Sequence, residues 1–76
     1  MGVPKRLTEM QMRFAEFYVF GGPDGPMTQT EAAIAAGYSP NRARQEGSEL
    51  MNPRLSPLVA KYVGELREER LKKHEV

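Results

Sequence analysis

The chain has 76 residues, of which 39% are hydrophobic, and this length suits one small domain and excludes a large enzyme. Cysteine is absent and His74 is the single histidine, which excludes disulfides, thiolate zinc sites, cysteine nucleophiles and metal sites built on several imidazoles. No apolar run approaches the roughly 18 residues of a membrane span, so the sequence predicts a soluble, intracellular protein with no membrane partner.

The net charge of +1 is an average over segments of opposite sign. Residues 1–14 hold Lys5, Arg6 and Arg13 against Glu9, whereas residues 15–38 hold only acidic charges and the remainder is mildly basic. A total so close to zero does not by itself indicate a nucleic-acid-binding protein, as an isoelectric point above about 9 would. It does permit a local basic patch.

The predicted fold class is all-α, because no segment alternates apolar and polar residues in the manner of a strand. Thr8 with Gln11 three residues later has the layout of a capping box, which starts a first helix. Apolar residues then follow at helical spacing as far as Gly21. The glycine- and proline-rich segment that runs from there to Pro26 cannot continue a helix, so we expect a loop.

Two short helices are expected on either side of Gly37. Thr28 and Glu31 hold the positions of another capping box, which starts a helix of about nine residues, and Gly37 falls where a left-handed residue ends such a helix. Ser39 is expected to cap the third helix, with the following proline at its first position. This helix is predicted to run to about Met51.

A fourth helix is predicted to begin at Asn52-Pro53 or at Ser56-Pro57, since either pair can cap a helix. After it, the segment from Arg67 to Val76 is almost entirely charged, which predicts a solvated, frayed helical end. The sequence thus predicts a four-helix domain over residues 1–66 and a charged C-terminal tail over residues 67–76. One apolar stripe is expected along the fourth helix: Leu55, Leu58, Val59, Tyr62, Val63 and Leu66.

The junction of the second and third helices is the most informative feature. Two short helices separated by a turn of about three residues with a glycine have the layout of a helix-turn-helix. Ala33 is expected at the crossing of the two helices, and Tyr38 is expected to point into the core. At 100° per residue the third helix turns Ala43, Gly47 and Leu50 inward and Asn41, Gln45 and Ser48 outward, with Arg42 and Arg44 on the flanks and Glu46 near the inner edge.

The outward residues are suited to double-stranded DNA. Asparagine and glutamine pair with adenine, arginine pairs with guanine or phosphate, and a polar residue at a helix start donates to phosphate. In the alternative interpretation, Arg42 and Arg44 are surface residues that pair with Glu46 or Glu49. A basic pair before the first helix is suited to a minor groove, although such pairs are more often solvated tails. The candidate DNA-binding residues are Gln29, Asn41, Arg42, Arg44, Gln45, Ser48, Lys5 and Arg6.

Residues 7 to 66 resemble the N-terminal DNA-binding domain of the small subunit of tailed-bacteriophage terminases. Two segments depart from the family pattern: the loop before Pro26 is longer and richer in glycine and proline, and Leu55-Ser56-Pro57 interrupts the start of the last helix. The motifs that carry the resemblance occur in order: Leu7-Thr8-Glu9, Gln11, Arg13-Phe14 and Glu16-Phe17-Tyr18, then Thr28-Gln29, Ala32-Ala33 and Ala36-Gly37-Tyr38-Ser39, then Ala43-Arg44, Gly47-Ser48, Leu50 and Asn52-Pro53.

The resemblance implies a subunit that recognises viral double-stranded DNA for genome packaging in the cytoplasm of an infected or lysogenic bacterial host. It implies a homo-oligomeric ring that acts with a terminase large subunit, which carries the ATPase and the nuclease. It also implies that residues 67–76 begin an oligomerisation helix, in a chain that is either part of a longer protein or a short relative.

Other function classes stay open beside this one. A helix-turn-helix transcription regulator would share the DNA contacts, and a small helical protein-interaction module would have none. An enzyme is the least favoured class, because the carboxylates are spread over the surface and no nucleophile–base pair or phosphate-binding glycine loop is present. No cofactor and no metal are expected.

Overall fold

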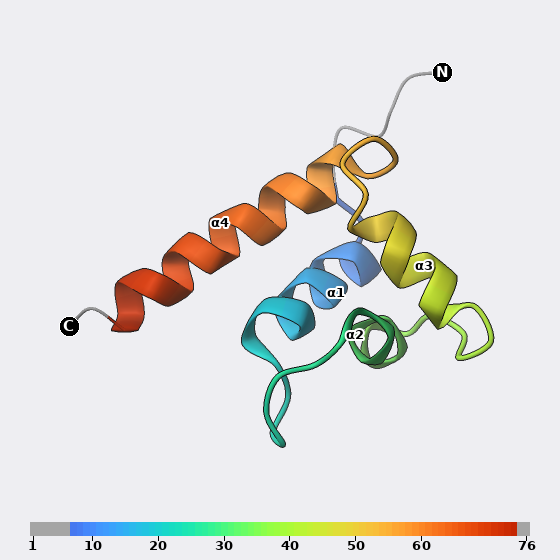
Figure 1. Cartoon of the computed structure of the whole chain (residues 1–76), viewed down its shortest axis with the longest axis horizontal. Coiled ribbons are helices and arrows are strands. Elements are labelled where there is room, and N and C mark those ends of the chain that lie inside the picture. The colour runs from blue at the N-terminus through green and yellow to red at the C-terminus, as the bar shows by residue number, and fades with distance from the viewer. Residues whose placement is uncertain (1–6, 75–76) are drawn as a thin grey trace.

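The computed structural model describes residues 7–74, which contain the four predicted helices and no sheet (Figure 1). In chain order the helices are α1 (Glu9–Phe20), α2 (Gln29–Ala36), α3 (Ala43–Leu50) and α4 (Pro57–His74). The helix α1 packs against both α2 and α4, and α2 packs against α3. None of the described helices combines the length and the apolar character that a bilayer crossing requires. Because the described residues form four α-helices and no sheet, the all-α class is confirmed.

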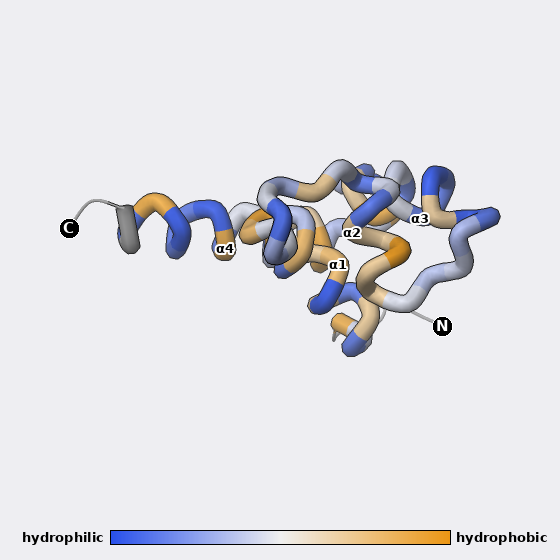
Figure 2. The backbone as a smooth tube through the Cα atoms, turned by 90° about the horizontal axis from the view of Figure 1, so that it is seen from below, coloured by the Kyte–Doolittle hydropathy of each residue, from blue (hydrophilic) through white to orange (hydrophobic). Residues whose placement is uncertain are grey.

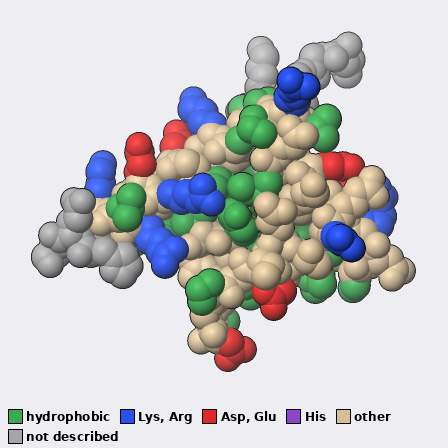
Figure 3. Space-filling model, viewed as in Figure 1, with side chains coloured by type: hydrophobic (Ala, Val, Ile, Leu, Met, Phe, Trp, Pro, Cys, Tyr) green, Lys and Arg blue, Asp and Glu red, His purple; other side chains and the backbone are tan. Residues whose placement is uncertain are grey.

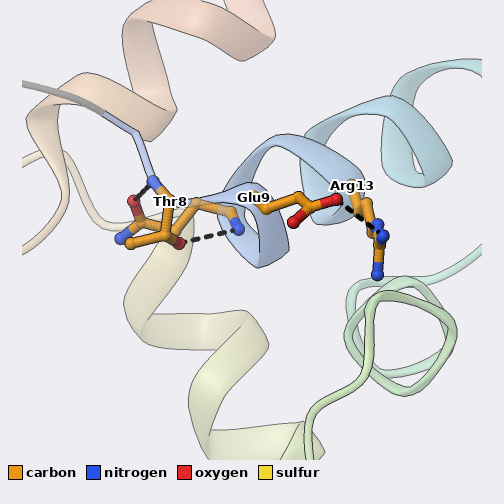
Figure 4. A network of polar contacts seen from close by, with 4 residues as sticks. Thr8, Glu9 and Arg13 are labelled. Carbon is orange, nitrogen blue, oxygen red and sulfur yellow. Dashed lines mark hydrogen bonds and ion pairs between the residues drawn. The ribbon is translucent and has the colours of Figure 1, made fainter.

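Both predicted capping boxes are present. The Thr8 hydroxyl accepts a hydrogen bond from the Gln11 N–H at 3.1 Å, and the Gln11 side chain accepts one from the Thr8 N–H at 2.9 Å. Figure 4 shows this cap beside the ion pair between Glu9 and Arg13. At the start of α2, Thr28 and Glu31 repeat the arrangement at 3.2 and 2.9 Å. Two of the donors that a helix start leaves unpaired are thereby satisfied in each helix.

The end of α2 follows the prediction, but the start of α3 does not. Gly37 is left-handed with φ +114°, and its N–H and that of Tyr38 donate to carbonyls of the last turn of α2. The third helix was predicted to start at Pro40, but α3 begins at Ala43. The Arg42 N–H donates to the Ser39 carbonyl at 3.0 Å and closes a turn instead. Proline suits the second position of a turn as well as the first position of a helix.

Of the two alternatives for the fourth helix, the second is correct, since α4 starts at Pro57. The preceding segment is a turn in which the Asn52 carbonyl accepts from the N–H groups of Leu55 and Ser56 at 3.0 and 2.8 Å. Leu55 was expected on the buried stripe, but it lies in this turn with 63% of its surface exposed. The rest of the stripe is buried or half-buried: Leu58, Val59, Tyr62, Val63 and Leu66.

Small side chains let the helices approach closely around a core in which the largest fully buried residues are Phe14, Val59 and Val63. Alanines fill the spaces between α1, α2 and α3, and Tyr38 packs against this core from its edge. The predicted inner side of α3 is confirmed, because its members are buried. The buried hydrophobic residues are Phe14, Ala15, Val19, Ala32, Ala33, Ala36, Ala43, Leu50, Val59, Val63 and Leu66.

The C-terminal part of α4 extends beyond the other helices, and hydrophilic residues dominate it (Figure 2). The turn that begins at Arg67 is exposed, as predicted, but it is in contact with the rest of the domain. The Arg67 guanidinium carbon lies 5.6 Å from the centre of the Tyr18 ring, and Arg70 donates to the Val19 carbonyl at 3.0 Å. In Figure 3 basic side chains lie over the apolar region between α4 and α1. The proposed division between residues 66 and 67 thus falls inside a continuous helix.

Candidate nucleic-acid interface

A glycine fixes α3 against the start of α2. A Cβ atom added to Gly47 would lie 2.9 Å from the carbonyl oxygen of Gln29 and 3.2 Å from its Cβ, closer than ordinary contacts allow. The predicted crossing residue Ala33 is fully buried, but it is Gly47 that permits this close approach. The signal in the sequence was a glycine inside a helix, where it costs about 1 kcal/mol relative to alanine. This contact places Gln29 beside α3.

The outward side of α3 and the turn before it form a shallow surface depression. Asn41, Arg44, Gln45 and Ser48 line it together with Glu49. The four predicted residues among them are all exposed. The structure therefore brings these four side chains to one surface, with Asn41 contributed by the turn rather than by the helix.

The other predicted residues occupy different positions. Arg42 belongs to the turn and its side chain is 68% exposed, while Gln29 is half-buried at the first position of α2. Lys5 and Arg6 lie outside the described residues, so the proposed basic arm has no structural account. Neither Arg42 nor Gln29 lines the depression.

Charges on this surface are partly paired. The Arg42 Nη2 atom lies 3.4 Å from the Glu46 Oε1 atom, as the surface-residue alternative predicted for this arginine. The Gln45 amide donates to the Glu49 carboxylate at 3.0 Å. Arg44, in contrast, makes no ion pair within residues 7–74 and is exposed. It is the cation on this helix that is open to an anionic ligand.

Glu46 lies at the inner edge of α3, and its side chain is 22% exposed. The second helix of a helix-turn-helix more often has an aliphatic residue at this position. Burial raises the pKa of the nearby Tyr38 phenol, and the negative charge of Glu46 raises it further. The phenol therefore stays protonated at neutral pH. Since Ala43 and Gly47 are buried, the presence of Glu46 does not reflect a different rotation of the helix.

Backbone donors at the start of α2 add to the surface. The capping box uses the N–H groups of Thr28 and Glu31. The N–H groups of Gln29 and Thr30 have no acceptor in the described part of the chain, because a first helical turn contains no carbonyl that can reach them. Such groups are suited to phosphate oxygens. The first of them belongs to Gln29, the residue that contacts Gly47 in α3.

Sequence reasoning treated Glu49 only as a partner for an arginine, but the structure places it in the depression with its carboxylate on Gln45. Its spacing of four residues from Gln45 is the signal that would have predicted this bond. Among the described residues, no group of histidine and acidic side chains is arranged to bind a metal ion. The side chains that line the depression offer hydrogen bonds and charge to a ligand.

A comparison with models of protein families matches residues 7–76 to the terminase small subunit family. The matched segment begins one residue before the Thr8 cap and includes all four helices. No curated protein and no solved structure matches the chain. The match thus covers both the α2–α3 surface and the part of α4 that extends beyond the other helices.

Proposed function

Because the chain belongs to the terminase small subunit family, we propose that its α2–α3 unit is a helix-turn-helix that binds double-stranded viral DNA for genome packaging. One observation carries the proposal: a single exposed surface of the α2–α3 unit is lined by Asn41, Arg44, Gln45 and Ser48. A helix of about 10–12 Å diameter fits the major groove of B-DNA, which is about 12 Å wide.

The two helices have different roles in the proposed complex. The helix α3 lies in the major groove, where Asn41, Gln45 and Ser48 reach base edges and Arg44 binds guanine or a phosphate. The start of α2 donates the N–H groups of Gln29 and its neighbour to a backbone phosphate. Arg42 exchanges its partner Glu46 for a second phosphate. Contacts to phosphates fix the position of α3, and contacts to bases supply any sequence preference.

The wider packaging role follows from the family. We propose that several copies of this subunit assemble, that they deliver DNA to a large subunit with the ATPase and nuclease activities, and that this takes place in the cytoplasm of a bacterial host. The chain itself then acts as a binding subunit. One copy offers few phosphate contacts, so several copies on one DNA molecule would raise the affinity strongly.

The proposal is tested by fluorescence anisotropy of a labelled duplex at two salt concentrations. Arg44→Ala should weaken binding at least about fivefold and reduce the slope of log affinity against log salt by about 0.9, the value for one phosphate contact. The matched control is Lys61→Ala, which removes an exposed cation from α4. It should leave affinity within about twofold, since a charge outside the interface contributes little at these salt concentrations.

The same titration distinguishes the other function classes. If Arg44→Ala and Lys61→Ala changed the affinity equally, α3 would not be part of the DNA-binding interface. Binding as a dimer to half-sites about 34–36 Å apart would favour a transcription regulator. The absence of any duplex binding by the wild-type chain would favour a protein-interaction module.

A further inference from the structure

Glu49 is an acidic side chain on a surface whose proposed ligand is a polyanion. It lines the depression together with Arg44, Gln45 and Ser48, and it is half-buried. A carboxylate repels phosphate, so this position weakens binding to the DNA backbone in general. A carboxylate at the centre of such a surface gains energy only where the ligand presents a hydrogen-bond donor.

The contact with Gln45 determines what this pair offers to a ligand. The Gln45 Nε2 atom donates to the Glu49 Oε2 atom at 3.0 Å, one helical turn away. The bond uses one amide hydrogen and holds the side-chain amide in one orientation. The amide oxygen of Gln45 and the second carboxylate oxygen of Glu49 make no hydrogen bond within the described residues. Two acceptors of this pair are thus open to a ligand.

In the major groove, the bases differ in whether they donate or accept. Cytosine presents its N4 amino group and adenine its N6 amino group, and both donate. Guanine O6 and N7 and thymine O4 only accept, so they would face the carboxylate without a proton between them. Carboxylates accept from cytosine N4, whereas glutamine amides pair with adenine.

From this geometry we propose that Glu49, with the Gln45 amide that it orients, is a specificity-determining residue that selects a base with an exocyclic amino group. The inference rests on the proposed DNA binding through α3. Arg44 and the start of α2 hold the duplex, and the carboxylate makes every other base at that position unfavourable. The pair therefore lowers affinity for most sequences and favours duplexes with cytosine or adenine at one position.

The test is a selection from a randomised duplex pool, with the chain immobilised at high density so that several copies act on each duplex. Glu49→Gln keeps the size of the side chain and its hydrogen bond to Gln45, but removes the charge. Glu46→Gln is the matched control, because it removes the same charge from the same helix at a residue outside the depression. Amide spectra of both variants verify that each folds like the wild type.

The wild-type chain should enrich cytosine or adenine at one position. Glu49→Gln should reduce that preference by a factor of about 5 to 150 and should bind the unselected pool more tightly. Glu46→Gln frees Arg42 and should also bind the unselected pool more tightly, but it should retain the wild-type base preference, which is the deciding readout. Enrichment of cytosine would identify Glu49 as the group that contacts the base, and enrichment of adenine would identify Gln45.

Three results would overturn the inference. If the chain binds duplexes but Glu49→Gln retains the wild-type base preference, Glu49 does not read a base although the proposed function stands. The same conclusion follows if both substitutions change the preference alike. If no duplex is retained by the wild-type chain at any salt concentration, the proposed DNA binding itself is refuted, and this inference with it.

Discussion

Replacing Gly47 by alanine tests the contact that positions α3. The added Cβ atom would lie 2.9 Å from the Gln29 carbonyl oxygen and 3.1 Å from its carbon, and neither backbone atom can rotate away. Overpacking of this kind costs about 1–3 kcal/mol, and the better helix propensity of alanine returns about 1 kcal/mol. We expect a net loss of up to about 2 kcal/mol in the free energy of unfolding.

The matched control for this substitution is Gly64→Ala in α4, where an added Cβ atom meets nothing within 4 Å. Alanine should stabilise the protein there by about 0.5–1 kcal/mol. Thermal unfolding followed by circular dichroism measures both effects, since 1 kcal/mol shifts the melting temperature of a domain of this size by about 4–8 °C. Gly47→Ala should therefore melt up to about 16 °C below the wild type and Gly64→Ala above it. A Gly47→Ala variant as stable as Gly64→Ala would refute the close contact between α2 and α3.

Three further changes test other parts of the account. Thr28→Ala removes the N-cap of α2 and should lower the stability to urea by about 1 kcal/mol, whereas an unchanged midpoint would contradict the cap. Arg70→Ala removes the hydrogen bond to the Val19 carbonyl, so the amides at the end of α4 should exchange faster with solvent; unchanged exchange would mean that this bond does not hold the helix. Burial raises the pKa of Tyr62, and its hydrogen bond to Glu16 raises it further, so its contribution to stability is complete below about pH 10 and is lost as pH rises through the higher folded pKa. Urea unfolding between pH 9 and 11 should show a smaller loss of stability in Tyr62→Phe than in the wild type, and equal losses would contradict this.

The features that the sequence predicted correctly depend on neighbours within one helical turn. The caps at Thr8 and Thr28 require a polar side chain and a partner three residues later, and the turn at Gly37 requires a residue that accepts positive φ. The inner side of α3 follows from helical periodicity, which the burial of Gly47 confirms. These signals are local, so no knowledge of the tertiary fold was needed to read them.

The features that were missed depend on residues far apart in the chain or on two conformations that fit equally well. Pro40 is compatible with both a turn and a helix start, and the hydrogen bond back to Ser39 decides between them. The contact of Arg70 with Val19 joins residues in α4 and α1, so a charged run that reads as a free tail is attached to the domain. The bond between Gln45 and Glu49, in contrast, joins residues one helical turn apart, and their spacing is a local signal that could have predicted it.

The most direct test of the central claim is an NMR titration of the chain with a short duplex at two salt concentrations, following backbone amides. The account predicts shifts confined to Gln29, Arg44, Gln45 and their neighbours on α3, with affinity falling by about 0.9 log units per log unit of salt for each phosphate contacted. Shifts on α1 and α4 that leave α3 unchanged, or no shifts at either salt concentration, would contradict the claim that the outward surface of α3 binds DNA.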